Sequence, residues 1–176
     1  MLDNAKSIFI INKIFTNLRN KKKLNIIKYN KRLLNKLNIT KEDFNMYLML
    51  KIFNTKYKTK LEDIEIKEIN LDGIIKNEAL KDLCEIKFKR VYKLSLCENA
   101  IWDINSLEKL NLKNLKILKL RYNSISDISV LGKVKFEELK ELNLYKNNIP
   151  DINVLKNVKF EKLELLNLSR NIDILE

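Results

Sequence analysis

The chain has 176 residues, of which 45% are apolar, so it is long enough to fill a core and too hydrophobic to be disordered. With only two Gly and one Pro, it lacks the turn residues of a β-sandwich or barrel. It contains no His, the commonest general base and metal ligand, and too few glycines for a phosphate-binding loop. We therefore expect a folded protein that is not an enzyme and needs no metal or cofactor.

The positive charge is concentrated near the amino terminus. The formal net charge is +12, and residues 1–60 carry the whole excess, whereas acidic and basic residues balance over 61–176. Such asymmetry indicates contact with nucleic acid, an acidic membrane or an acidic protein. A solvated Lys-rich surface that follows from biased composition is the alternative, and the sequence leaves both open.

Three helices are predicted in this basic segment. Apolar residues recur at helical spacing over 5–18 and again over 21–37. Thr40 and Asp43 have the spacing of a capping box, which predicts a third helix that runs to about Phe53. Packed together, the three helices would cover the first strand of the domain that follows.

The second of these predicted helices carries a basic patch, together with the residues just before it. The cations of the patch are Lys21, Lys22, Lys23, Lys28, Arg32 and Lys36. Like charges at helical spacing repel one another, and a partner with phosphates or carboxylates would reverse that cost. The patch therefore predicts an anionic partner or a nuclear-localisation role.

Residues 10–37 also faintly resemble an F-box. The resemblance rests on Ile14, Phe15 and Leu18 and on the leucine-containing helix after them, while Asn4-Ala5 stands where that family has Leu-Pro. The resemblance implies docking on the adaptor of a ubiquitin ligase, with the substrate held by trailing leucine-rich repeats.

An internal repeat dominates the rest of the chain. Four asparagines recur at a spacing of 24, and each closes the phrase L-x-x-L-x-L-x-x-N, with Val in the first place of the first copy; they are Asn99, Asn123, Asn147 and Asn171. The alternating leucines predict a strand with one buried face, and stacked copies predict a parallel sheet. Ile66, Ile69 and Leu71 fit a degenerate earlier copy in which Ile74 takes the asparagine place.

These residues resemble the leucine-rich repeat, in the short internalin-like form that continues Asn-x-Ile-x-Asp-Ile. The resemblance implies an α/β solenoid with a parallel β-sheet on its concave face, about five coils over residues 61–176, capped by the three-helix segment of residues 1–60. The four asparagines are expected to be structural, with their amides bonded to the backbone of the adjoining coil. Asp103, Asp127 and Asp151 are expected to fasten the loops that follow.

The outward positions of the strands define the expected recognition surface. In the first full copy, Lys93, Ser95 and Cys97 are predicted to point outward, with Cys97 exposed. The residues expected to contact a partner are those of the later copies, where Tyr and Arg offer interface energy; they are Ile117, Lys119, Arg121, Tyr122, Glu141, Tyr145, Lys146, Leu165 and Arg170. Ordinary solvation of these positions is the alternative.

Cysteine use and the termini bear on location and assembly. Cys84 and Cys97 form no disulfide framework or metal-ligand spacing, which indicates a reducing compartment. No signal peptide or transmembrane segment is expected, so the cytoplasm or nucleus is predicted. The sequence stops five residues after Asn171 without a capping coil, which predicts self-association through that edge or a truncated product of a longer array.

The leading hypothesis is a non-catalytic protein–protein interaction module that binds its partner on the concave sheet. An F-box and leucine-rich-repeat adaptor of a ubiquitin ligase is the first alternative. Anchoring to nucleic acid or an acidic membrane through the basic helices is the second.

Overall fold

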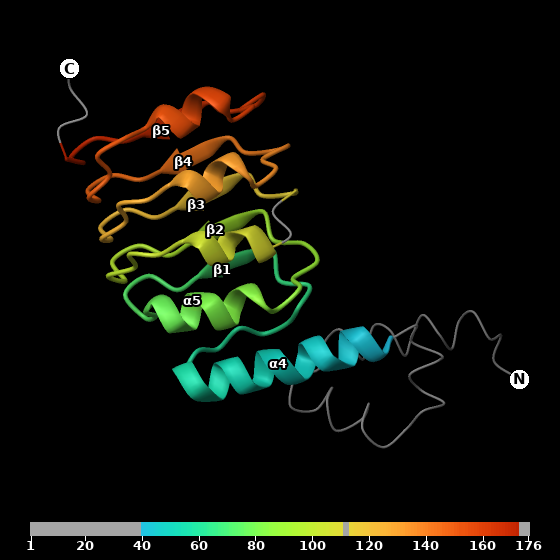
Figure 1. Cartoon of the computed structure of the whole chain (residues 1–176). Helices are drawn as coiled ribbons and strands as arrows, with labels where there is room; N and C mark the ends of the chain where they lie inside the picture. Colours follow the sequence, from blue (N-terminus) through green and yellow to red (C-terminus); the bar gives the residue numbers. More distant parts are fainter. Residues whose placement is uncertain (1–39, 111–112, 173–176) are drawn as a thin grey trace, which may run out of the picture.

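The computed structural model describes residues 40–110 and 113–172 (Figure 1). One helix, α4 (Lys41–Tyr57), precedes a stack of coils, each of which contributes one short strand. The five strands form one parallel sheet in chain order; they are β1 (Glu68–Asn70), β2 (Lys93–Ser95), β3 (Ile117–Lys119), β4 (Glu141–Asn143) and β5 (Leu165–Asn167). The helices predicted over 5–18 and 21–37, the basic patch and the F-box-like stretch lie outside the described residues.

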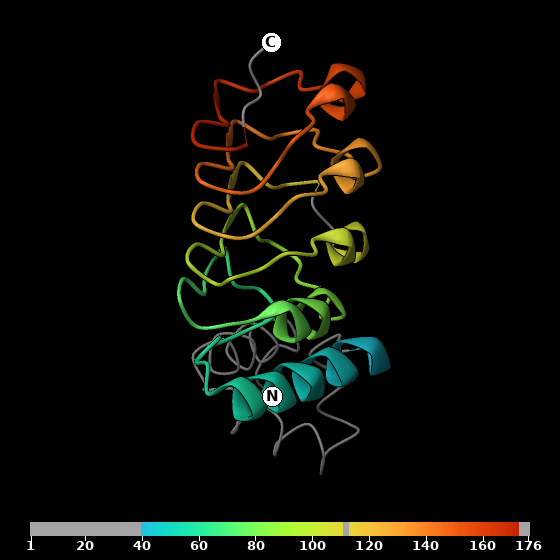
Figure 2. The ribbon, with the colours of Figure 1, turned by 60° about the vertical axis from the view of Figure 1, so that its left-hand side comes forward.

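Each strand except β5 is followed by a helical return on the other side of its coil. These returns are α5 (Asn77–Cys84), η1 (Asn105–Lys109), η2 (Ser129–Gly132) and η3 (Asn153–Asn157), of which the last three are 3-10 helices. Figure 2 shows the returns stacked along one side and the sheet along the other. The result is a short leucine-rich-repeat solenoid, as the repeat predicted.

The strand register reproduces the sequence repeat. Leu94 pairs with Leu118, Leu118 with Leu142, and Leu142 with Leu166, each 24 residues further along the chain. The first step is one residue longer, because Ile69 pairs with Leu94. That extra residue makes the first coil the irregular one.

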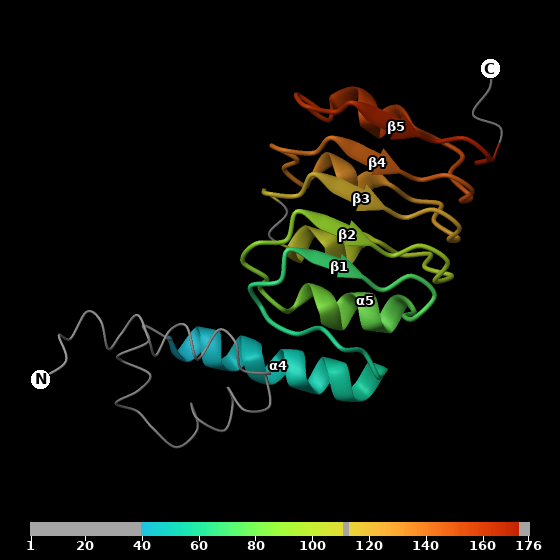
Figure 3. The same ribbon diagram turned by 180° about the vertical axis from the view of Figure 1, so that it is seen from behind.

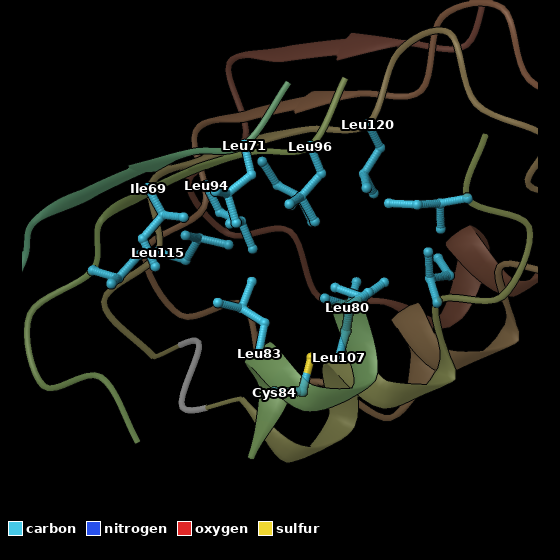
Figure 4. Packing of buried hydrophobic residues seen from close by; sticks show 14 of the residues in the cluster. Ile69, Leu71, Leu80, Leu83, Cys84, Leu94, Leu96, Leu107, Leu115 and Leu120 are labelled. Atoms are coloured by element: carbon cyan, nitrogen blue, oxygen red, sulfur yellow. The ribbon is translucent and has the colours of Figure 1, made fainter. Parts of the chain in front are cut away.

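The paired leucines of each repeat point into the solenoid. Leu94, Leu118 and Leu142 are no more than 1% exposed, and Leu96, Leu120 and Leu144 beside them are fully buried. Figure 4 shows Leu71, Leu96 and Leu120 in line, facing Leu80, Leu83 and Leu107 from the helical side. Each buried leucine stabilises the fold by about 1.5–3 kcal/mol, which no single coil could obtain alone.

The last coil is more exposed than the others. Leu166 is 41% exposed and Ile172 54%, although the equivalents of Leu166 in β2 to β4 are buried. Within the described part of the chain, β5 has a neighbouring strand only on its β4 side. Self-association through this edge stays a prediction.

Helix α4 begins as predicted. The side chain of Thr40 accepts a hydrogen bond from the backbone N–H of Asp43 at 3.0 Å, and the Asp43 carboxylate accepts one from the N–H of Thr40 at 3.1 Å. The helix continues to Tyr57, four residues past the expected end, and Lys58 closes it at a φ of 53°. The Asn54 side chain then pairs with both backbone groups of Leu61, with N–O distances of 2.7 and 3.0 Å, and fastens the turn.

One face of α4 covers the first coil. Tyr47, Leu50 and Phe53, three residues apart, are buried in the common core. Lys56 and Tyr57 both bond the Asp82 carboxylate of α5, at 2.8 and 2.7 Å.

The predicted three-helix cap is not shown, because its first two helices lie outside the described residues and only α4 corresponds to one of the three. Two helices are described, and the second, α5, belongs to the first coil and not to the cap. The division of the chain at residue 60 into two domains stays a prediction. Among the residues that the structure describes, no helix is long and apolar enough to cross a membrane.

Candidate interaction surface

The four repeated asparagines, Asn99, Asn123, Asn147 and Asn171, form an asparagine ladder that holds the backbone from which the outer side chains project. The Asn123 side-chain oxygen accepts the N–H groups of Asn99 and Ile101, at 3.1 and 2.9 Å. Its amide nitrogen donates to the Leu96 and Leu120 carbonyls, both at 2.9 Å. Asn99, Asn147 and Asn171 each bond the preceding coil in the same manner. These bonds satisfy buried backbone groups at the turn that ends every strand.

The loop aspartates act at the start of the 3-10 helices. The carboxylates of Asp103, Asp127 and Asp151 each accept the backbone N–H two residues ahead, at 2.8 Å in all three coils. In Asp127, the hydrogen bonds from Ser129 hold the carboxyl pKa below its ordinary value. All three carboxylates are thus already hydrogen-bonded within their own loops.

One residue before each asparagine, the backbone enters the left-handed region. The φ angles there are 61° at Glu98, 55° at Tyr122, 53° at Lys146 and 57° at Arg170, and Gly73 has 65° in the first coil. This conformation costs a non-glycine residue roughly 1–2 kcal/mol. Because every coil adopts it, this conformation belongs to the repeat, and it places one residue per coil in a column at the strand ends.

Four residues of this column and its neighbours form a strand-end cluster, which we define as Arg121, Tyr122, Tyr145 and Lys146. The rings of Tyr122 and Tyr145 meet edge to face, with centroids 5.4 Å apart. Lys146 Nζ lies 5.0 Å from the centre of the Tyr122 ring, and the Arg121 guanidinium carbon lies 5.9 Å from it. The cluster therefore combines a rigid aromatic pair with two cations, and Tyr122 remains 39% exposed.

The backbone of the cluster is held from the next coil. The N–H of Tyr122 donates to the Tyr145 carbonyl at 2.9 Å, and the N–H of Lys146 donates to the Ser169 carbonyl at 2.9 Å. On the other side, Arg121 Nη2 lies 4.0 Å from Glu98 Oε1. Contact with Cys97, together with the charges of Glu98 and Asp72, raises the pKa of the Arg121 guanidinium.

The expected exposure of Cys97 is wrong. Cys97 is 1% exposed, and Ser95, the other outward position near it, is 4% exposed. The Asp72 carboxylate accepts hydrogen bonds from the Ser95 hydroxyl and the Cys97 N–H, both at 2.7 Å, and Arg121 lies against Cys97 from the other side. Short side chains between longer neighbours are covered even on an outer face.

The other residues expected to contact a partner differ in how available they are. Lys119 and Glu141 pair with each other at 3.1 Å, so each already has a counter-charge. Ile117 is half-buried, Leu165 is 47% exposed and Arg170 is exposed. The structure brings Arg121, Tyr122, Tyr145 and Lys146 together and leaves Leu165 and Arg170 on the last coil.

Nothing in the described part points to a metal or a reactive thiol. Cys84 and Cys97 are free and buried, and burial raises the pKa of the Cys84 thiol to about 12. Within residues 40–110 and 113–172, no group of three acidic or cysteine side chains is placed to hold a metal ion.

Ion pairs between coils were not expected from the sequence. Lys140 pairs with Glu164 and Lys162 with Glu138, both at 2.5 Å and both across 24 residues. Lys109 pairs with Glu85 across the same interval. The signal was available, since opposite charges one repeat apart must be neighbours once the coils stack.

Among solved structures, the chain is similar to two internalins. The chain is similar to an internalin (inlF) from Listeria monocytogenes str. 4b F2365, at 33% identity and a TM-score of 0.44, over 52% of this chain and 25% of that one. It is also similar to an internalin C2 (inlC2) of the same organism, at 14% identity and a TM-score of 0.34, over 70% of this chain and 83% of that one.

This chain therefore spans about a quarter of the first internalin. No family model matches it, and neither does any curated protein. The F-box resemblance is not supported. The leucine-rich-repeat fold is shown by the chain's own strand register and by the hydrogen bonds of its repeated asparagines.

Proposed function

We propose that the protein is a non-catalytic interaction module that binds a protein partner on the outer face of its sheet, with the strand-end cluster as the centre of contact. The observation that carries this proposal is the exposed Tyr122 ring, packed edge to face on Tyr145 and flanked by Lys146 and Arg121. Tyr and Arg are the residue types most enriched where interfaces obtain their affinity.

The cluster is also preorganised. Each of its tyrosines lies on backbone that is hydrogen-bonded to a neighbouring coil, and the two rings restrain each other. A partner therefore loses little affinity to the ordering of these side chains. Figure 3 views the sheet with the helical returns behind it, so the side facing the viewer is free of covering helices in the described structure.

The test is capture of partners from the native cell, followed by affinity measurement with the partner recovered. Replacing Tyr122 and Tyr145 by Ala should weaken binding by about 30-fold or more, because a true interface centre contributes about 2 kcal/mol. Asn123 is left intact so that the fold is preserved.

Two comparison variants sharpen this test. Lys133→Ala with Lys156→Ala changes exposed residues at the end of η2 and within η3 and should leave the affinity unchanged. Trp102→Ala removes a large aromatic side chain, 63% exposed in the loop after β2, that is not a member of the cluster. Binding that survives loss of both tyrosines but fails without Trp102 would contradict the proposal.

A further inference from the structure

A basic groove of about 490 Å³ lies at the opposite edge of the sheet from the strand-end cluster, where the strands begin. Residues that precede β1, β2, β3 and β4 line it, and they carry five cations and two carboxylates. The sequence-based surface included none of them. The groove is open along one side, and seven of its nine lining residues are charged.

The repeat fixes the spacing of the lining side chains. Lys67, Tyr92 and Lys116 each stand directly before a strand, in equivalent positions of successive coils. The Lys67 carbonyl accepts the N–H of Tyr92 at 2.8 Å, and the Tyr92 carbonyl accepts that of Lys116 at 2.7 Å. Adjacent members of this row are therefore held about one strand spacing apart, near 4.8 Å. The groove is therefore preorganised by the backbone of the coils.

Four of its cations form no ion pair within the described residues, although Lys116 lies close enough to Glu138 to help lower the pKa of that carboxyl. No carboxylate in residues 40–110 or 113–172 forms an ion pair with Lys67, Arg90, Lys113 or Lys116. The fifth, Lys89, pairs with Asp43 at 2.6 Å and with Glu65 at 3.5 Å. Of the two carboxylates, Glu138 is held by Lys162 from the next coil. The groove therefore gathers four cations that form no ion pair with the described carboxylates.

We propose that this groove binds an acidic peptide segment of a partner protein, which lies across the coils with its carboxylates on Lys67, Arg90, Lys113 and Lys116. The proposal concerns a second site and does not depend on the strand-end cluster.

The shape of the groove favours a peptide over other anions. Sites for small molecules are enclosed and lined mainly by hydrophobic side chains, whereas this one is open and lined mainly by charged side chains. Its cationic part spans two strand spacings, about 10 Å, and then meets Glu137 and Glu138; that length suits about three residues of extended chain. Single-stranded nucleic acid is usually bound by several aromatic side chains on which successive bases stack, whereas the lining of this groove contains one aromatic residue, Tyr92.

The experiment measures binding of a capped hexaglutamate peptide to the full chain by titration calorimetry at low salt. The groove variant Lys113→Glu/Lys116→Glu should weaken binding by about tenfold or more, since two attractive contacts become repulsive. The control Lys156→Glu/Lys159→Glu changes the net charge equally at exposed positions outside the groove and should match the wild type. Lys113→Gln/Lys116→Gln, with an unchanged urea midpoint, separates loss of contact from loss of fold.

Two further arms separate other sources of binding. Lys21→Gln/Lys22→Gln/Lys23→Gln reports any contribution from the basic patch, and inorganic triphosphate replaces the peptide in a parallel titration. Weakening in the groove variants alone supports the proposal. It is overturned if the wild type does not bind the peptide, if the control or the patch variant loses as much affinity as the groove variant, or if triphosphate binds more tightly than the peptide through the same lysines.

Discussion

The side-chain oxygen of Asn123 accepts the backbone N–H of Asn99 at 3.1 Å, so the asparagine of one coil satisfies the same position of the coil before it. A second bond recurs in all four repeats, because each asparagine side-chain amide donates to a leucine carbonyl at the strand end of the preceding coil. The asparagines therefore join the coils through polar groups, while the leucines join them through the core.

The first prediction concerns Asn123→Ala. The substitution removes five hydrogen bonds to backbone groups, most of them buried; the partners are Asn99, Ile101, Leu96, Leu120 and Arg121. Each buried group left unpaired costs about 1–3 kcal/mol, so the free energy of unfolding should fall by about 3 kcal/mol or more. Asn171→Ala, at a half-buried position, should cost about 1 kcal/mol. Urea unfolding measures both free energies, and an equal loss in the two variants would contradict the proposed contribution of the buried asparagine hydrogen bonds.

A second prediction uses Gly73, the member of the left-handed column that is a glycine. Its φ is 65°, and a Cβ built there meets no atom within 4 Å. Gly73→Ala should therefore lower the free energy of unfolding through backbone strain alone, by about 1 kcal/mol. Gly73→Asn should cost less, because Asn tolerates this conformation. A loss from Asn that equals the loss from Ala, measured in urea, would point to a cause other than φ.

The core and the sheet register could be predicted because both follow from the repeat. Leu118 and Leu142 had to be neighbours once a period of 24 was recognised, and the capping box placed the start of α4. The coverage of Cys97 could not be predicted by alternation alone, since it depends on the lengths and hydrogen bonds of side chains on the flanking coils.

The side-chain packing of the candidate surfaces also could not be predicted from sequence spacing alone. Sequence spacing placed Tyr122 and Tyr145 on adjacent coils, but their edge-to-face packing and the approach of Lys146 depend on the left-handed backbone at the strand ends. The basic groove was missed because Lys67, Arg90 and Lys116 lie in loops before the strands, where single lysines carry little information in a Lys-rich chain.

The third prediction is loss of stability in acid through Asp43. Burial tends to raise the pKa of this carboxyl, but hydrogen bonds from Lys89 and Thr40 outweigh burial, and the pKa in the folded protein lies below its ordinary value. A carboxyl with a depressed pKa stabilises the fold above its unfolded pKa, near 3.9, and this contribution disappears as the pH falls through the folded pKa. The difference in unfolding free energy between wild type and Asp43→Asn should thus be about 1 kcal/mol near pH 6 and shrink below pH 4. A difference that is constant from about pH 6 to about pH 2.5 would show that ionisation of Asp43 is not the cause.

A fourth prediction tests the burial of the two thiols. Cys84 and Cys97 are 2% and 1% exposed, so a thiol reagent at pH 8 should label neither in the native protein and both after unfolding in guanidinium. Asp72→Ala removes the carboxylate that covers the outer side of β2 and should speed the labelling of Cys97. Ser124→Cys, at an exposed position, provides the rate for a free thiol. Prompt labelling of native Cys97 would contradict the packing around Asp72, and prompt labelling of native Cys84 would contradict its burial in α5.

The fifth prediction addresses the basic patch in residues 21–36, which precedes the described part of the chain. If the patch anchors the protein to phosphates, its affinity for a DNA duplex or for phosphatidylserine vesicles should fall steeply with salt, because bound cations release counterions. The variant Lys21→Gln/Lys22→Gln/Lys23→Gln should reduce the slope of log affinity against log salt by about 3 for the duplex. Lys133→Gln/Lys156→Gln/Lys159→Gln removes the same charge from exposed positions of the solenoid and should leave that slope unchanged. Fluorescence anisotropy and vesicle co-sedimentation between about 50 and 200 mM salt measure the two ligands. An affinity that does not vary with salt, or a slope that responds equally to both triple variants, would exclude the patch as the anchor.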